Sequence, residues 1–157
     1  MPEIHIYTDG SSLGNPGPGG YGIIIEWVGK GHIKEFSRGF KYTTNNRMEL
    51  WAVIDALEKL KKKPMDVLII SDSKYVIEAI EKKWVFGWQK KNFKGKKNPD
   101  LWKRFLKIYS QHNVQFQWVK GHNNHPQNER CDQLAVTAAK DMAIEQDIYY
   151  EQLKQKA

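Results

Sequence analysis

The sequence of 157 residues has little of what marks an exported, disulfide-bonded or membrane-spanning protein. Its single cysteine, Cys131, excludes an intramolecular disulfide and a cysteine-rich zinc site. No apolar run approaches the roughly 20 residues that a helix needs to cross a bilayer. The first residues have neither the basic nor the apolar segment of a secretory signal. We therefore expect a cytoplasmic protein that does not engage membranes, with one domain over residues 1–142 and a polar tail over 143–157.

Positive charge is abundant, and most of its excess lies in one stretch. The chain has a net charge of +7, yet residues 82–107 alone contain ten basic residues and one acid, Asp100. The same stretch contains Trp84, Trp88, Phe93 and Trp102. Lysines interleaved with aromatic rings are typical of surfaces that bind phosphates, sugars and bases. The alternative is an amphipathic helix and loop whose lysines are simply solvated; the concentration of aromatic residues favours nucleic acid. We call residues 82–98 the basic handle.

Hydrophobic periodicity predicts an α/β fold. Strands and helices follow one another in the order expected when three antiparallel strands precede two strands that return by long crossovers, parallel to the first. Residues 9–20, with five glycines and two prolines, are expected to form a loop. The predicted strands are 3–8, 21–28, 32–42, 65–70 and 113–119; the predicted helices are 45–61, 73–83 and 127–142, with a helix–loop–helix in the basic stretch up to about 110.

Two acidic residues stand where predicted parallel strands end. Asp9 follows the first strand and Asp72 follows the strand at 65–70. Each has an ordinary explanation, Asp9 as a turn residue and Asp72 as a helix N-cap. If the two strands are neighbours, however, both carboxylates lie at the carboxyl edge of one sheet, where open α/β sheets place their sites.

Two further acids begin apolar helix faces. Glu49 shares its face with alanine and valine residues three, four and seven positions later, and Asp132 does the same in the last helix. The helix dipole alone could favour both acids. An unpaired carboxylate that points towards packed surface is nevertheless costly.

Convergence of these four acids at one edge would raise their pKa values by mutual repulsion, and divalent cations would relieve it. Oxygen ligands favour Mg²⁺, Mn²⁺ or Ca²⁺ over zinc. Two such ions form the usual arrangement for phosphodiester hydrolysis. With the basic handle, the acids predict a nuclease.

Four runs of the sequence resemble bacterial ribonuclease HI, in the order found in that family, across residues 3–142. They are YTDGSSLGNPGPGGYG (7–22), TTNNRMEL (43–50), SDSKYV (71–76) and WVKGHNNHPQNERCDQLA (118–135). The resemblance implies a ribonuclease H-like fold, with a five-stranded mixed sheet flanked by helices. It also implies a monomeric endonuclease that cleaves the RNA strand of an RNA–DNA hybrid, leaving 5′-phosphate and 3′-hydroxyl ends. The implied cofactor is a pair of Mg²⁺ ions, with Mn²⁺ as a substitute.

The resemblance also assigns roles to individual residues. Asp9, Glu49, Asp72 and Asp132 would be the metal ligands, His122 the mobile catalytic histidine, and Glu129 a second acid that orients water or metal from outside. Gly10, Ser11, Asn45 and Asn46 would reach RNA 2′-hydroxyls. The DNA strand would be held at a phosphate pocket and along the basic handle by Asn15, Thr44, Arg47, Trp84, Trp88, Lys90, Lys91 and Lys94.

Some positions depart from the family pattern, namely Phe93, where tryptophan is common, and Lys74, where glutamine is frequent. Two other functions stay open. A catalytically silent nucleic-acid-binding module would use the basic handle alone, although the complete set of acids argues against it. A polynucleotidyl transferase core would have a different acid arrangement and flanking domains.

Overall fold

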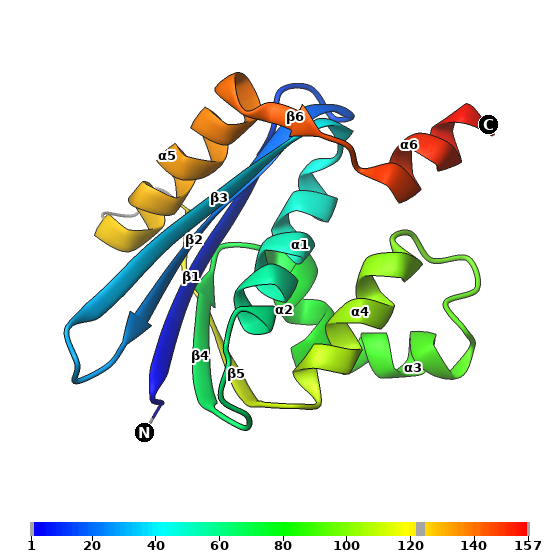
Figure 1. The fold of residues 1–157 in the computed structure, drawn as a ribbon. Helices are drawn as coiled ribbons and strands as arrows, with labels where there is room; N and C mark the ends of the chain where they lie inside the picture. Colours follow the sequence, from blue (N-terminus) through cyan, green and yellow to red (C-terminus); the bar gives the residue numbers. More distant parts are fainter. Residues whose placement is uncertain (1, 122–124, 157) are drawn as a thin grey trace.

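The computed structural model describes residues 2–121 and 125–156, and its centre is one mixed sheet (Figure 1). In chain order the first five strands are β1 (Ile4–Ser12), β2 (Gly17–Trp27), β3 (His32–Thr43), β4 (Asp66–Ser71) and β5 (Asn113–Trp118). The strand order across the sheet is β5-β4-β1-β2-β3-β6. β1, β2 and β3 are antiparallel neighbours, and β4 and β5 run parallel to β1. The predicted α/β class and strand directions are confirmed.

The glycine-rich segment is not the long loop that the sequence predicts. β1 continues to Ser12 and β2 begins at Gly17, so that only residues 13–16 connect them. The glycines act by close approach: a Cβ atom on Gly20 would lie 2.6 Å from the Cβ atom of Ala138, and one on Gly10 would lie 2.5 Å from the Glu49 amide nitrogen. The missing side chains let helices lie against both faces of the sheet.

Helices cover both faces of the sheet, and strand alternation decides which residues each helix meets. On one face, α1 (Asn45–Glu58) packs against β1 and β2, and α4 (Pro99–Tyr109) packs on α1. On the other face, α5 (Pro126–Asp141) crosses β1, β2 and β3 (Figure 1). The larger core on the α1 side includes Ile4, Ile6 and Ile25, and the smaller one includes Tyr7 and Cys131.

The basic stretch forms α3 (Trp84–Lys90), a loop, and then α4. α2 (Lys74–Glu81) precedes it and leads into α3 (Figure 1). Three apolar side chains of this stretch are buried, those of Val85, Phe93 and Trp102, whereas Trp84 stays 48% exposed. The helix–loop–helix expected there is confirmed. None of the helices in the described part of the chain is long and apolar enough to span a membrane.

The sheet has six strands rather than the five expected, because residues beyond 142 join it. β6 (Ala143–Glu145) pairs parallel with β3, and α6 (Ile148–Gln155) follows. Glu145 accepts hydrogen bonds from Arg38, with Nη2–Oε1 at 2.7 Å. The polar composition of this segment hides these pairings, which join residues more than 100 positions apart.

Candidate active site

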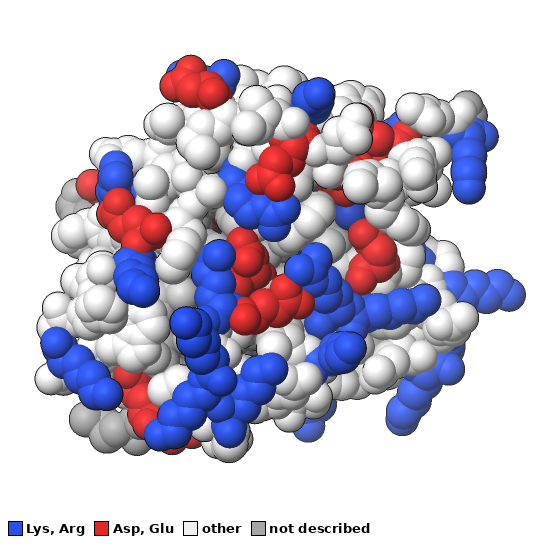
Figure 2. All heavy atoms as spheres, viewed as in Figure 1, with Lys and Arg blue, Asp and Glu red and all other residues white. Residues whose placement is uncertain are grey.

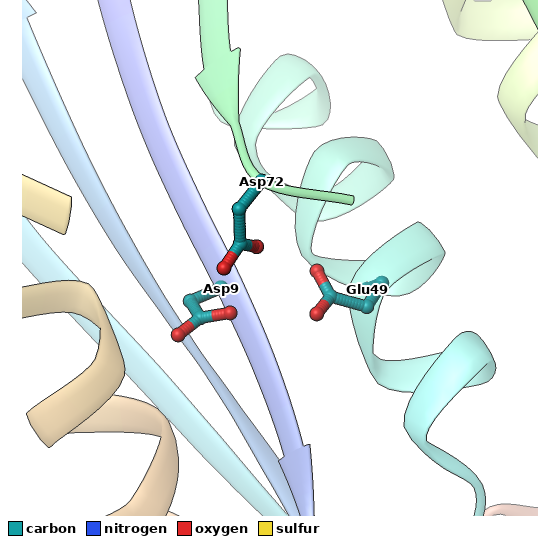
Figure 3. Close-up of side chains that lie close together, drawn as sticks. All are labelled: Asp9, Glu49 and Asp72. Carbon is teal, nitrogen blue, oxygen red and sulfur yellow. The ribbon is translucent and has the colours of Figure 1, made fainter. Parts of the chain in front are cut away.

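Asp9 and Asp72 lie side by side because of the register between two parallel strands. β1 and β4 pair from Ile4 with Val67 as far as Tyr7 with Ile70. Each aspartate comes two residues after that last pair, so the two side chains leave neighbouring strands at the same level. Parallel neighbours at matching positions project to the same face of the sheet. The predicted meeting of the two acids at the carboxyl edge is therefore what the structure shows (Figure 3).

Glu49 reaches the two aspartates from the first turns of α1. Its helix begins after Thr44, whose side chain accepts a hydrogen bond from the Arg47 amide as an N-cap. The close contact at Gly10 brings the backbone of α1 against β1, next to Asp9. One carboxylate oxygen from each of Asp9, Glu49 and Asp72 lies within 4.8 Å of those of the other two (Figure 3).

The three carboxylates form a largely buried cluster of like charges. Asp9 is 8% exposed and Glu49 is 7% exposed. Burial, followed by the charges of Asp72 and Asp132, raises the pKa of Asp9 to about 8, against which a hydrogen bond from the Gly10 amide works. Burial and the charges of Asp9 and Asp72 likewise raise the pKa of Glu49 well above its usual value. The site thus concentrates negative charge where water solvates it poorly.

The cluster fits a hard divalent cation on the chemistry of its donors. It offers carboxylate oxygens alone, which Mg²⁺ and Mn²⁺ accept readily. Glu49 Oε2 is buried, and no hydrogen-bond partner for it is found among the described residues. A buried acceptor oxygen without a donor, beside two like charges, is the arrangement that a cation completes.

Asp132 and Glu129 differ in their distance from this cluster. Asp132 lies on α5, half-buried, and its charge and side-chain hydrogen bond contribute to the raised pKa of Asp9. It is not part of the group whose oxygens meet within 4.8 Å. Glu129 is exposed in the first turn of α5 and also lies outside that group. The structure thus brings three of the predicted acids together, with Asp132 at their border.

The chain before His122 passes close to Asp72. A Cβ atom on Gly121 would lie 2.8 Å from Asp72 Oδ2, so this glycine leaves room for the carboxylate. His122 itself lies outside the described residues. The Trp118 indole donates to the Asp72 carbonyl oxygen at 3.1 Å, and the Lys74 ammonium lies 5.1 Å from the Trp118 ring centre. Lys74, the departure from the family pattern, thus contacts a ring that is itself bonded to the backbone of Asp72.

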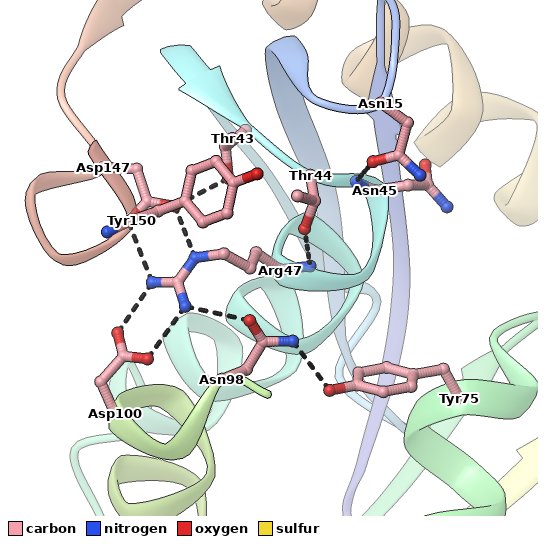
Figure 4. A network of polar contacts seen from close by, with 10 residues as sticks. All are labelled: Asn15, Thr43, Thr44, Asn45, Arg47, Tyr75, Asn98, Asp100, Asp147 and Tyr150. Carbon is pink, nitrogen blue, oxygen red and sulfur yellow. Dashed lines mark hydrogen bonds and ion pairs between the residues drawn. The ribbon is translucent and has the colours of Figure 1, made fainter. Parts of the chain in front are cut away.

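Arg47 lies in the interior, which conflicts with its expected place in a phosphate pocket. The residue is 0% exposed. Its guanidinium forms two-pronged ion pairs with Asp147, with Nε–Oδ2 at 2.6 Å, and with Asp100, with Nη2–Oδ2 at 2.7 Å (Figure 4). It also donates to Asn98, which in turn donates to Tyr75. The family-like spacing TTNNRMEL cannot reveal this, because both carboxylate partners are distant in sequence.

A cavity of about 450 Å³ does collect several other expected binding residues. Asn15, Thr44 and Asn46 line it. The Asn15 side-chain oxygen accepts from the Asn45 amide at 3.0 Å, which joins the β1–β2 connection to the start of α1 (Figure 4). The sequence does not predict the residues of the opposite wall, because they come close to the cavity only in the folded chain. That wall comes from the end of the basic handle and from α6: Lys96, Lys97, Asn98, Tyr149, Leu153 and Lys154.

The basic handle presents its lysines to solvent beside this cavity. Lys90, Lys91 and Lys94 are exposed, and Lys and Arg side chains project from the right-hand side of Figure 2, where α3 and its following loop lie. Trp88 is partly covered, since Trp102 meets its ring edge-on and the Lys96 ammonium lies 5.0 Å from its centre. Trp84 is the more accessible ring.

Gly10 and Ser11 immediately follow Asp9 in β1, and Asn45 and Asn46 occupy the first turn of α1. These four residues, expected to meet RNA hydroxyls, flank the acid cluster on two adjoining elements. Gly10 is buried against α1, whereas Asn46 is exposed. The arrangement therefore offers polar groups beside the carboxylates.

Comparisons with known proteins agree with this geometry. The family model described as RNase H matches residues 1–140. A ribonuclease H of Desulforamulus reducens is 54% identical over 153 residues, which cover 94% of each chain. One of Shewanella baltica is 53% identical over 153 residues, covering 94% of this chain and 96% of the relative.

Solved structures are similar over most of the chain as well. The structure of LC9-RNase H1, a type 1 RNase H, matches with a TM-score of 0.80 and 35% identity, covering 90% of this chain and 74% of that one. The structure of LC11-RNase H1 in complex with an RNA/DNA hybrid matches with a TM-score of 0.66 and 31% identity, covering 87% and 96%.

Proposed function

The chain belongs to the ribonuclease H family, and we propose that it cleaves the RNA strand of RNA–DNA hybrids endonucleolytically, leaving 5′-phosphate and 3′-hydroxyl ends. The observation that carries the proposal is the meeting of Asp9, Glu49 and Asp72 within 4.8 Å, in a site that buries Asp9 and Glu49. A solved relative bound to a hybrid supports the substrate.

Metal dependence follows from the family and from the donor set. We propose that Asp9, Glu49 and Asp72 hold Mg²⁺, with Asp132 completing a site for two ions and Mn²⁺ acting as a substitute. When bound, such ions activate the attacking water and stabilise the leaving oxygen. The protein contributes a fixed spacing of carboxylates, set by strand register and by the close approach of α1 at Gly10.

The remaining expected residues act on the substrate in this proposal. Gly10, Ser11, Asn45 and Asn46 recognise RNA hydroxyls next to the acids, and Asn15 and Thr44 hold a DNA phosphate in the cavity shared with Asn98 and the handle. Lys90, Lys91, Lys94, Trp84 and Trp88 bind along the DNA strand. Arg47 supports this surface from beneath, because it binds Asn98 while it is itself buried.

His122 and Glu129 keep the roles that the family resemblance implies. His122 assists proton transfer or product release, and Glu129 orients water or metal from outside the cluster. His122→Ala should lower kcat much more than it raises KM. A change confined to KM would assign His122 to substrate contact alone. A cytoplasmic location and a monomeric state stay predictions from the sequence.

The test is a substrate panel with Mg²⁺, Mn²⁺ or EDTA. RNA–DNA hybrid, double-stranded RNA and double-stranded DNA of one sequence are incubated with the protein, and the product ends are identified by phosphatase and ligase treatment. Cleavage of the hybrid RNA strand alone, dependent on metal, supports the proposal. Tight binding without cleavage would instead identify a silent binding module, and cleavage of double-stranded DNA would contradict the substrate class.

A further inference from the structure

The cavity of about 450 Å³ at the start of α1 needs a cation if it holds a DNA phosphate, because a phosphate diester carries a negative charge. The family resemblance assigns this role to Arg47. The structure directs Arg47 inward instead, since it is 0% exposed and pairs with Asp100 and Asp147. The positive charge for the phosphate must therefore come from other residues. We call this space the lysine cavity, because its lining includes Lys96, Lys97 and Lys154.

One wall of the lysine cavity offers donors that carry no charge. The Thr44 side-chain oxygen accepts from the Arg47 amide, and the Asn15 side-chain oxygen accepts from the Asn45 amide. Within the described residues neither side chain donates a hydrogen bond, so the Thr44 hydroxyl and the Asn15 amide group can both donate to a ligand oxygen. These groups can orient a phosphate, but they do not neutralise it.

The opposite wall supplies cations from two elements that are distant in sequence. Lys97 lies in the loop that ends the basic handle, and Lys154 lies in the last turn of α6. Both side chains are exposed, and among residues 2–121 and 125–156 no ion pair involves either of them. The Lys154 ammonium lies 5.4 Å from the ring centre of Tyr150, which also lines the cavity. No acid is found in the lining over the same part of the chain.

A second cavity beside α6 has the opposite charge balance. It has a volume of about 740 Å³ and shares Tyr149 with the lysine cavity. Three acids line it, and both of its arginines are paired with carboxylates, Arg38 with Glu145 and Arg104 with Glu58. An anion gains little where the protein already balances its own charges, and it gains more where cations lack partners. The lysine cavity is therefore the better anion site of the two.

Buried contacts hold both lysine-bearing elements in place. Asp147, the N-cap residue of α6, accepts from the Thr43 hydroxyl at 2.7 Å and from Arg47 Nε at 2.6 Å (Figure 4). Arg47 Nη1 also donates at 3.2 Å to Asn98, which directly follows Lys97. One buried guanidinium thus ties the start of α6 and the end of the basic handle to α1. The two lysines project from anchored backbone, so little ordering is left for the ligand to impose.

We propose that Lys97 and Lys154 bind a phosphate of the DNA strand in the lysine cavity and supply the positive charge that Arg47 does not. Asn15 and Thr44 orient the phosphate, and the two ammonium groups neutralise it. The helix α6, which the sequence presents as part of a polar tail, thereby belongs to the substrate-binding surface. This inference rests on the proposed cleavage of hybrids and adds two binding residues to it.

The experiment measures fluorescence anisotropy of a labelled RNA–DNA hybrid in EDTA, over a range of NaCl concentrations, together with KM for cleavage in Mg²⁺. Lys154→Gln should weaken binding about fivefold at low salt, raise KM, and reduce the log–log salt slope by about one phosphate contact. Lys156→Gln is the matched control, because it removes the same charge from an exposed position at the end of α6 that does not line the cavity. It should change the affinity less than twofold. Both variants should melt at the temperature of the unmodified protein.

A chemical probe identifies the phosphate. Hybrids that carry one uncharged methylphosphonate at successive positions of the DNA strand should include one that binds the unmodified protein more weakly, and Lys154→Gln should be insensitive to that same replacement. Sensitivity confined to the RNA strand would contradict the inference. Equal binding by the Lys154→Gln and Lys156→Gln variants, while the unmodified protein cleaves hybrids, would overturn the inference and leave the proposed function intact. An unmodified protein that neither binds nor cleaves hybrids would overturn both.

Discussion

The acid cluster and the basic handle carry opposite charges and are built in opposite ways. Asp9 and Glu49 are buried and Asp72 is half-buried, and two strands and a helix fix the separation of the three acids. Lysines of the handle are exposed on short helices and a loop, with no fixed spacing imposed by a sheet. Buried like charges cost stability and respond strongly to small displacements, whereas exposed charges act through long-range, salt-screened attraction.

From this contrast we expect the two regions to affect different kinetic quantities. We expect the fixed carboxylates to determine the rate of the chemical step, because metal ligation depends on ångström-scale positions. We expect the exposed lysines to determine affinity, because phosphate contacts release counterions without requiring a unique geometry. Substitutions in the first region should therefore change kcat, and those in the second should change the dissociation constant and its salt dependence.

The largest effect is expected from removal of the acids. Asp9→Asn, Glu49→Gln and Asp72→Asn should each lower hybrid cleavage in Mg²⁺ by about a thousandfold or more, a barrier increase of about 4 kcal/mol. Asp132→Asn should lose less, since Asp132 lies outside the tight group. Single-turnover cleavage assays measure the effect, with Asp141→Asn, at an exposed position of α5, as the control. Near-normal cleavage by any of the first three variants would contradict the assignment.

Arg47 offers the next test, because its burial makes it structural rather than a surface contact. Arg47→Ala removes the cation that pairs with the fully buried Asp147 and should cost about 3–5 kcal/mol of the free energy of unfolding. Arg130→Ala, which removes an exposed pair with Glu35, should cost less than about 1 kcal/mol. Urea unfolding measures both. If Arg47→Ala instead left the stability unchanged and raised KM for the hybrid, Arg47 would belong to the substrate surface.

The basic handle should respond through affinity. Changing Lys90, Lys91 and Lys94 together to glutamine should weaken hybrid binding by about tenfold or more at low salt, with kcat nearly constant. Each lost phosphate contact should flatten the log–log salt slope by about 0.9 on B-form duplex, with a somewhat different value on a hybrid. Changing Lys61, Lys62 and Lys63, at the other end of the sheet, is the matched control. If the triple variant kept the salt slope of the unmodified protein, the basic handle would be a solvated surface that does not bind the hybrid.

The smallest effect concerns His112, which lies before β5 and away from both regions. Burial, with a contribution from Lys63, lowers the pKa of this imidazole, whose Nδ1 accepts from the Met65 amide at 3.1 Å. The unfolded chain therefore binds the proton more readily, and stability should fall as pH drops below about 6.5. One proton limits the slope to about 1.4 kcal/mol per pH unit. Chemical unfolding at several pH values should show a weaker dependence of stability on pH for His112→Asn than for the unmodified protein.

Sequence patterns predicted the fold where local periodicity and packing agree. The alternation at Ile4 and Ile6 and the apolar run before Asp72 correctly predicted two strands. The positions of Asp9 and Asp72 at the ends of these strands predicted that the two aspartates meet. The patterns failed where a residue acts through distant partners. Gly10 and Gly20 lie within strands, where the lack of a side chain lets a helix pack closely on the sheet. Arg47 is a buried cation because Asp100 and Asp147, which are distant in sequence, pair with it.

Thermal unfolding with and without Mg²⁺ tests most directly whether the acids are held in a repulsive site that metal completes. Because the pKa of Asp9 is raised to about 8, the folded state retains its proton longer than the unfolded state, and stability is lost as pH rises from about 4 towards 8. At pH 8.5 saturating Mg²⁺ should raise the melting temperature of the unmodified protein by about 5 °C. Asp9→Asn should already melt higher without Mg²⁺ and gain little from it, whereas Asp141→Asn should behave like the unmodified protein. A melting temperature that ignores Mg²⁺, together with an Asp9→Asn variant of lower stability, would contradict the account.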